Sequence, residues 1–330
     1  EIGVRLVGSE MCIRDRFSNL GFVVIDEQHR FGVEQRARLW TKNEQPPHIL
    51  VMTATPIPRT LAMTLYGDLD VSVIDELPPG RQPIRTVHYT DAARLRLFGF
   101  MRQEIKKGRQ IYVVYPLIKE SETMDYKDLQ DGYEAISRDF PLPEYVTTIC
   151  HGKMKPEDKE ESMRQFKSGE ANIMVATSVI EVGVDVPNAT VMVIESAERF
   201  GLSQLHQLRG RVGRGSQQSY CILMSGEKLS KEARLRLEAM CETNDGFRLA
   251  ELDLKLRGAG DVNGTLQSGM AFDLKIANPT LDSQILTVTR EAAAEVLTAD
   301  PTLAQNGHEG LRELRKRYSG REEIDFSQIS

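Results

Sequence analysis

Two adjacent carboxylates stand where a metal-bound phosphate could be held. In the stretch VVIDEQHRFG, residues 23–32, a run of apolar residues ends directly in Asp26 and Glu27. A strand that is apolar on both faces and ends in acids is typical of a parallel sheet with a ligand site at its carboxyl edge. There an aspartate can hold Mg²⁺ through water, and a glutamate can orient the water that attacks a phosphate. The pair alone is equally compatible with a strand that simply ends in two acids.

Two threonines predict a second strand end at the same edge. The apolar run HILVM, residues 48–52, leads into Thr53 and Thr55. Their hydroxyl groups could form hydrogen bonds with the carboxylates of Asp26 and Glu27, and Pro56 stiffens the loop that follows.

A segment rich in arginine and glycine, QLHQLRGRVGRG at residues 204–215, carries the strongest signal. Its period predicts that Gln207, Arg211 and Arg214 lie on or near one face of a helix, with Gly210 and Gly213 allowing close backbone approach. Guanidinium groups suit a triphosphate whose charge shifts during hydrolysis. A merely solvent-exposed basic helix is the alternative, and two glycines disfavour it because each lowers helix propensity.

The loop that normally cradles such a triphosphate is missing. The pattern G-x-x-x-x-G-K-[ST] does not occur, and the single Gly-Lys pair, at 152–153, is followed by Met154.

Strand-like and helix-like segments alternate around these motifs. This alternation predicts an α/β fold with a mainly parallel, doubly wound sheet. The expected strands lie at residues 22–27, 48–55, 84–90, 110–116, 144–150, 172–177, 190–196 and 219–224, and the expected helices at 32–40, 91–108, 156–170 and 282–297.

Composition fits an ordinary soluble chain of two domains: 330 residues, 40% hydrophobic, 27% charged and a net charge of −6. No apolar run approaches the roughly 20 residues of a membrane helix. The four cysteines form no C-x-x-C pair, which indicates neither a zinc site nor a disulfide framework and agrees with a reducing cytoplasm.

The motifs together resemble a known family. VVIDEQH, TATPIPRT, ATSVIEVGVDVP and QLRGRVGR, in this order and spacing, resemble the later motifs of superfamily 2 helicases. More narrowly, DEQHRFGVEQR, YVVYPLIKES, HGKM, MVIESAERFGLSQLHQLRGRVGRG and LKLRGAGDVNGTLQSG resemble the RecG family of branched-DNA helicases, over essentially residues 17–330.

The resemblance implies a RecA-like helicase motor followed by a mainly helical C-terminal region. It divides the chain into part of a first lobe at 17–77, an interlobe linker at 78–86, a complete second lobe at 87–227, a helical hairpin and translocation loop at 228–270, and a helical region at 271–330. In the family the Walker A loop and a wedge domain lie upstream, so we expect a C-terminal fragment. Residues 1–16 resemble a translated sequencing adaptor and are expected to be non-native.

The resemblance also implies roles for individual residues. Asp26 would coordinate Mg²⁺, Glu27 would activate water, and Arg211 and Arg214 would act as arginine fingers. The expected cofactor-binding residues are Gln28, His29, Gly183, Asp185 and Gln207. The expected DNA and translocation residues are Thr53, Thr55, His151, Lys153, Thr177, Ser178, Arg257 and Gln267.

The implied cofactors are ATP and Mg²⁺, and the implied partner is branched double-stranded DNA at stalled forks and Holliday junctions. We further expect a monomer in the bacterial cytoplasm, associated with the nucleoid, with single-stranded DNA-binding protein as a second partner. Without the phosphate loop the chain alone is expected to be inactive. Two alternatives stay open: a translocase like the transcription-repair coupling factor, which typically has a second glutamate at position 28, and a non-catalytic DNA-binding module.

Overall fold

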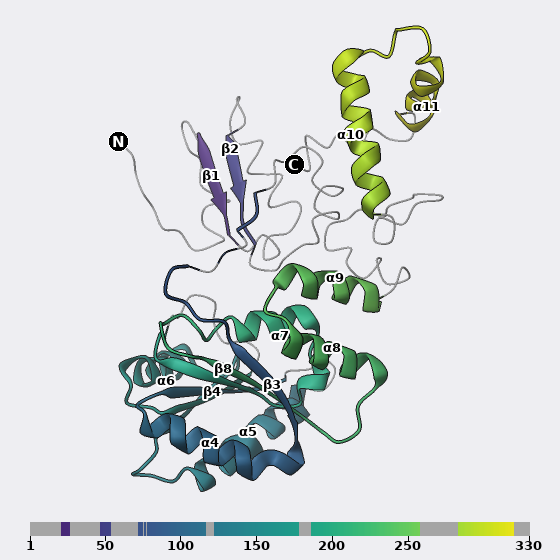
Figure 1. Cartoon of the computed structure of the whole chain (residues 1–330). Coiled ribbons are helices and arrows are strands. Elements are labelled where there is room, and N and C mark those ends of the chain that lie inside the picture. The colour runs from purple at the N-terminus through teal and green to yellow at the C-terminus, as the bar shows by residue number, and fades with distance from the viewer. Residues whose placement is uncertain are drawn as a thin grey trace. The chain divides into compact units, whose positions relative to one another are not determined.

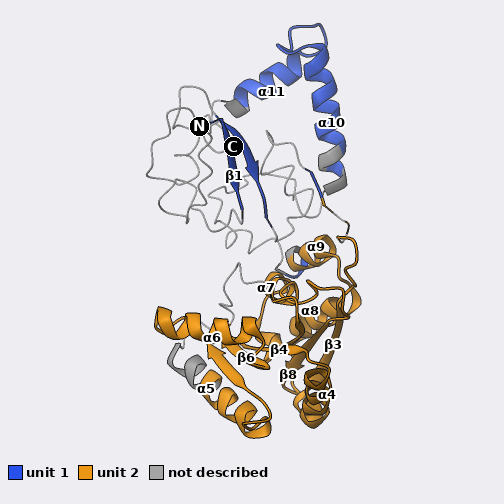
Figure 2. Cartoon of the chain, turned by 90° about the vertical axis from the view of Figure 1, so that its left-hand side faces the viewer, with its two compact units in different colours: residues 1–73, 254–330 blue, residues 74–253 orange. Residues whose placement is uncertain are grey.

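The computed structural model describes residues 21–26, 47–53, 72–74, 76, 78–116, 122–177, 186–257 and 283–319. The chain divides into two compact units (Figure 2), one formed by residues 74–253 and the other by residues 1–73 with 254–330. Each unit is described by itself.

The unit of residues 74–253 is built on six parallel strands (Figure 1). In chain order they are β3 (Arg85–Thr90), β4 (Gln110–Tyr115), β5 (Thr147–Cys150), β6 (Ile173–Thr177), β7 (Ala189–Ile194) and β8 (Tyr220–Ser225). Their spatial order is β3-β8-β7-β4-β6-β5, and every neighbouring pair is parallel. The predicted α/β fold with a doubly wound parallel sheet is confirmed.

Helices cover both faces of this sheet (Figure 1). The helices α4 (Arg94–Lys106) and α5 (Glu122–Asp139) lie on one face. The helices α6 (Pro156–Ser168), α7 (Leu202–Arg209) and α8 (Lys231–Glu242) lie on the other. Short 3₁₀ turns, η2 (Asp91–Ala93) and η4 (Ala197–Arg199), follow β3 and β7.

Alternate residues of the central strands pack against the two helical layers. Ile111 and Val113 of β4 join a core with Phe98 of α4 and Ile136 of α5. Tyr112, between them, packs instead against Phe166 of α6, with ring centroids 4.7 Å apart. Burial on both faces explains why the central strands are almost entirely apolar in sequence.

The helix ends follow local sequence. Pro156 occupies the start of α6, and Gly169 ends it in the left-handed region at φ 83°. The hydroxyl of Ser230 accepts a hydrogen bond from the amide of Ala233 over 3.1 Å and so caps α8.

In the other unit, β1 (Phe22–Ile25) pairs in parallel with β2 (His48–Val51). The helices α10 (Ser283–Ala299) and α11 (Glu309–Ser319) follow near the C-terminus, and α9 (Gly246–Arg257) contains the boundary between the units. The helix predicted at residues 32–40 lies outside the described residues. Within the described part, no helix is long and apolar enough to cross a membrane.

Candidate functional site

The structure brings Asp26 and Thr53 to the same edge of the β1–β2 pair. Ile25 is paired with Val51, and the amide of Met52 donates to the carbonyl oxygen of Ile25 over 2.7 Å. Asp26 and Thr53 therefore follow the carboxyl ends of neighbouring strands, and both are exposed. Glu27, Gln28, His29 and Thr55 lie outside the described residues.

This edge does not form a complete metal site in the part of the chain that the structure describes. No group of three metal-ligating side chains occurs among the described residues. Asp26 is the one described carboxylate at this edge, whereas Mg²⁺ takes six oxygen ligands in near-octahedral geometry. Asp26 can supply one ligand to a Mg²⁺ ion, directly or through water.

The predicted helical face with Gln207, Arg211 and Arg214 is wrong. Helix α7 ends at Arg209, and Gly210 follows it as the C-cap. Gln207 therefore lies in the helix, whereas Arg211 and Arg214 belong to the loop that leads into β8. Beyond the helix the chain turns at Gly213, whose φ of 79° lies in the left-handed region that favours glycine.

We call residues 210–219 the arginine loop. It lies at the amino edge of the six-stranded sheet, since it runs directly into the start of β8 and contacts the residues that precede β3 and β7. A Cβ on Gly213 would stand 2.9 Å from Cγ1 of Ile84, and one on Gly215 would stand 3.2 Å from the carbonyl oxygen of Pro187. Gly213 thus has the expected close approach, whereas Gly210 is exposed and has no neighbour closer than 3.5 Å.

Within the arginine loop the side chains alternate between core and surface. Val212 is 2% exposed, while Arg211 and Arg214 on either side of it are half-buried. Burial of Val212 therefore anchors the loop and keeps both neighbouring guanidinium groups within reach of solvent. Gly183 and Asp185, the other expected cofactor residues of this unit, lie outside the described residues.

The expected DNA-contacting residues of this unit occupy the opposite edge. His151 follows the end of β5, Lys153 is exposed two residues later, and Thr177 ends β6. The side chain of Thr177 is only 1% exposed, and burial lowers the pKa of His151 below its ordinary value. Ser178 and Gln267 lie outside the described residues, and Arg257 is the last residue of α9.

One arginine of the segment has a structural contact that sequence reasoning missed. Arg209 is 2% exposed, and its Nη1 donates to the carbonyl oxygens of Met240 (3.0 Å) and Thr243 (2.8 Å). It thereby ties α7 to the carboxyl end of α8. The sequence does indicate that Arg209 is buried, because Leu202, Leu205 and Arg209 are spaced i, i+3 and i+7 and so lie on one face of the helix.

A second missed feature is a buried ion pair at the carboxyl edge. Nη1 and Nη2 of Arg94 donate to the two carboxylate oxygens of Glu195 over 2.8 and 2.9 Å, and Nη2 also donates to Asp91 over 2.7 Å. Glu195 is 5% exposed, and these contacts raise the pKa of Arg94, its hydrogen bond to Glu195 being the main cause. The trio borders a pocket of about 380 Å³ between α4 and α5.

Comparison with known proteins shows which class of protein has this fold and these motifs. A family described as the helicase conserved C-terminal domain matches residues 94–216, and one described as domain 3, C-terminal, of the ATP-dependent DNA helicase RecG matches residues 243–330. A solved structure of RecG bound to a three-way DNA junction superposes with a TM-score of 0.62 at 44% identity, over 82% of this chain and 34% of that one. The six-stranded unit is a RecA-like helicase lobe.

Curated relatives narrow the class to one family. The ATP-dependent DNA helicase RecG of Synechocystis is 51% identical over 316 residues, which cover 95% of this chain and 37% of the relative. That of Aquifex aeolicus is 47% identical over 97% of this chain and 41% of the relative. The chain belongs to the RecG family, and it spans about two fifths of the length of these relatives.

Proposed function

We propose that this chain supplies the second motor lobe and the following helices of an ATP-dependent helicase that remodels branched double-stranded DNA. The relatives are named ATP-dependent DNA helicases, and a RecG protein has been solved on a three-way DNA junction. The structural observation that carries the proposal is the separation of two candidate sites. The arginine loop lies at the amino edge of one sheet, and the expected DNA-contacting residues lie at its carboxyl edge.

In this proposal the arginine loop serves ATP. Arg211 and Arg214 would contact the phosphates, because guanidinium groups match their geometry and stay charged. ATP would supply the free energy for movement, and Mg²⁺ would be held in part by Asp26. The remaining proposed residues are Glu27 for water activation and Gln28, His29, Gly183, Asp185 and Gln207 for nucleotide contacts.

The carboxyl edge would serve the DNA backbone. Lys153 is exposed at this edge, and His151 lies beside it at the end of β5. Contacts of this kind position a strand without reading its bases and weaken with salt. Thr177 is too buried for a direct contact through its side chain, so it would act by supporting the segment that follows β6. The other proposed DNA and translocation residues are Thr53, Thr55, Ser178, Arg257 and Gln267.

The wider description of the protein also belongs to this proposal. Residues 17–77 would be part of the first lobe, 78–86 the linker, 87–227 the second lobe, 228–270 the translocation hairpin and 271–330 a helical region. The protein would act as a monomer in the bacterial cytoplasm at the nucleoid, with single-stranded DNA-binding protein as a partner.

The test compares two proteins. The 330-residue chain by itself is expected to show no DNA-stimulated ATPase, because it has no G-x-x-x-x-G-K-[ST] loop. A chimaera that joins residues 17–330 to the upstream part of the Synechocystis relative is expected to hydrolyse ATP when branched DNA is added. The Arg214→Ala chimaera should lose about 10³-fold or more in kcat. DNA binding without any ATPase in the unaltered chimaera would favour a non-catalytic module instead.

A further inference from the structure

We propose that residues 82–85, which lead into β3 and include its first residue, form a strap that positions the arginine loop. The strap is the end of the segment that enters the sheet from residue 74, and the loop carries Arg211 and Arg214. Its contacts are independent of what the arginines bind. Its consequence for catalysis rests on the function proposed above.

Two glutamines bond the strap and the loop reciprocally. Nε2 of Gln82 donates to the carbonyl oxygen of Ser216 over 3.3 Å. In the other direction, Nε2 of Gln218 donates to the carbonyl oxygen of Pro83 over 2.9 Å. Each segment therefore contributes one side-chain donor and one backbone acceptor. Since Pro83 has no N–H, its carbonyl oxygen is the one backbone hydrogen-bonding group that it can offer.

Packing and a backbone bond complete the strap. The side chain of Ile84 lies against Gly213, where a Cβ would come within 2.9 Å of it. The amide of Arg85 donates to the carbonyl oxygen of Ser219 over 3.0 Å, which begins the ladder between β3 and β8. The loop is thus held at four successive strap residues, and Gly213, between the two arginines, is one of the points of contact.

The strap is itself fixed at its upstream end. The amide of Arg81 donates to the carbonyl oxygen of Pro78 over 3.1 Å, with Pro79 and Gly80 between them and Gly80 at φ 83°. Proline followed by glycine in this arrangement is typical of a type II turn. The segment predicted as a linker therefore enters the strap through an ordered turn.

The loop has a second tie, from the residue that precedes β4. Nη2 of Arg109 donates to Oε1 of Gln217 over 2.8 Å, and both side chains are near the surface of the amino edge. This bond fixes the middle of the loop to the sheet. The bond does not involve the strap. A variant that removes it therefore shows how the loop responds when a contact outside the strap is lost.

Loss of one exposed hydrogen bond of this kind is expected to raise local opening of the loop about threefold, so removal of both glutamine donors is expected to raise it about tenfold. The two glutamine hydrogen bonds hold the loop at residues 216 and 218, after Arg214, and the packing contact with Ile84 holds it at Gly213, between the two arginines. Displacement of the strap would therefore shift both guanidinium groups. Strain on the segment before β3 is therefore transmitted to the residues proposed to contact ATP.

The first test uses the 330-residue chain and needs no activity. Trypsin cleaves after arginine, so the rates of cleavage at the 211–212 and 214–215 bonds report exposure of the loop. The Gln82→Ala, Gln218→Glu double variant is expected to raise both rates about tenfold, since glutamate keeps the shape of glutamine but cannot donate when ionised. Gln130→Ala is the matched control and should leave both rates unchanged, since Gln130 is an exposed glutamine of α5 whose Nε2 donates to Glu134 of the same helix over 3.1 Å.

Two further variants keep this test decisive. Gln82 is exposed, so Gln82→Ala alone should fold with an unaltered melting temperature and still increase cleavage about threefold. Arg109→Gln should loosen the loop without altering the strap. Unchanged cleavage and unchanged amide hydrogen exchange over residues 210–219 in the folded double variant would overturn the proposal.

The second test measures the consequence in the chimaera. Arginines that meet the transition state affect kcat more than KM, so the double variant is expected to lower kcat for ATP about tenfold with little change in KM. Gln218→Asn, which keeps an amide donor on a shorter side chain, should recover part of the loss. An inactive unaltered chimaera would contradict the proposed function but not the strap, which the cleavage rates decide. An active chimaera with an unaltered kcat in the double variant would show that the strap does not position the arginines.

Discussion

Nη1 of Arg209 donates to the carbonyl oxygen of Thr243 over 2.8 Å, so the last residue of α7 is bonded to the residue that ends α8. The carbonyl groups at the end of a helix carry partial negative charge and have no partner within the helix. A buried guanidinium therefore finds its compensation there. Burial nevertheless lowers the pKa of Arg209 from its ordinary value.

Replacement of Arg209 by alanine is expected to lower the free energy of unfolding by about 2–4 kcal/mol. The variant leaves the carbonyl oxygens of Met240 and Thr243 buried without their donor and opens a cavity. Urea unfolding followed by circular dichroism measures the change. Arg138→Ala, on the exposed side of α5, is the control and should stay within about 0.5 kcal/mol of the parent. Equal effects of the two substitutions would contradict the role given to Arg209.

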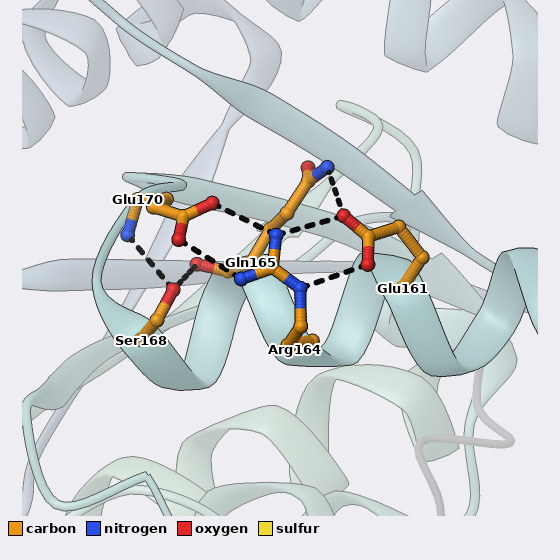
Figure 3. Close-up of polar contacts among 5 residues, drawn as sticks. All are labelled: Glu161, Arg164, Gln165, Ser168 and Glu170. Atoms are coloured by element: carbon orange, nitrogen blue, oxygen red, sulfur yellow. Dashed lines mark hydrogen bonds and ion pairs between the residues drawn. The ribbon is translucent and has the colours of Figure 1, made fainter.

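The ion pair of Arg94 with Glu195 is expected to matter far more than the exposed network around Arg164. In that network (Figure 3) Arg164 bonds Glu161 and Glu170 at the end of α6, and both carboxylates are more than half exposed. Glu195→Ala removes the partner of a half-buried arginine and should cost about 3 kcal/mol, whereas Glu161→Ala removes an exposed partner and should leave the free energy of unfolding close to that of the parent. Urea unfolding in 0.05 and 0.5 M salt measures both. A larger cost for Glu161→Ala than for Glu195→Ala would contradict this assessment.

Sequence patterns were sufficient for the strands and insufficient for the arginine loop. The six strands of the large sheet begin and end within about three residues of their predicted positions, because burial on both faces leaves an uninterrupted apolar run such as IYVVY. The end of α7 was missed because QLRGRVGR has helical spacing throughout. Beyond the helix, Gly213 packs against Ile84, more than a hundred residues earlier, and such a contact is not visible in a local pattern.

The candidate site was predictable only as a set of residue types. Acids, arginines and glycines indicated phosphate chemistry, but their positions at the edges of the sheet depend on the spatial order of the strands. That order places β8 between β3 and β7 and thereby brings the strap beside the arginine loop. Gln82 and Gln218 could not be singled out in the sequence, because nothing in the residues next to a loop glutamine indicates a hydrogen bond to a distant segment.

The connection between α10 and α11 is expected to depend on Asp300. This carboxylate is 5% exposed and accepts hydrogen bonds from the amides of Ala304 (3.0 Å) and Gln305 (2.8 Å) and from Nδ1 of His308 (2.9 Å). Asp300→Ala should increase amide exchange at residues 304 and 305 at least tenfold, because both amides lose their acceptor. The exposed Glu295→Ala of α10 should leave them unchanged.

The same carboxylate gives a pH dependence of known sign. The hydrogen bond from His308 is the main cause that lowers the pKa of Asp300 to about 2, from an ordinary value of 3.8. Its contribution to stability is therefore complete above about pH 4 and is lost as the pH falls toward 2. Protection of residues 304 and 305 that decreased between pH 8 and 5, rather than below 4, would contradict this account.

His206 is expected to make the six-stranded unit less stable in mild acid. Burial, with the charge of Arg209 as a second cause, lowers the pKa of His206 to about 4, from an ordinary value of 6.5. His206 therefore binds a proton near pH 6.5 in the unfolded chain but only near pH 4 in the native chain. The free energy of unfolding decreases as the pH falls from 6.5 to 4, because the unfolded chain binds more protons in this range. The largest loss of stability that this shift can cause is about 3 kcal/mol, and the partial contact of His206 with solvent keeps the actual loss below that value. Urea unfolding at pH 7.5, 6.5, 5.5 and 4.5 measures it, and His206→Gln should flatten the profile. An equally steep profile in that variant would assign the effect to other groups.

Two glycines of the arginine loop are expected to respond oppositely to alanine. Gly213 has φ 79°, and a Cβ there would stand 2.9 Å from Ile84, so Gly213→Ala should destabilise the unit by about 1–3 kcal/mol. Gly210 has φ −66° and no neighbour closer than 3.5 Å, so Gly210→Ala should be neutral or stabilise by about 0.5 kcal/mol, because alanine restricts the unfolded chain. Melting temperatures of the two variants measure the difference. Since Ile84 is the side chain that an added Cβ would meet first, Gly213→Ala combined with Ile84→Ala should recover part of the loss, whereas the backbone strain at positive φ would remain. A full recovery would show that the contact with the strap, and not the backbone conformation, requires glycine at this position.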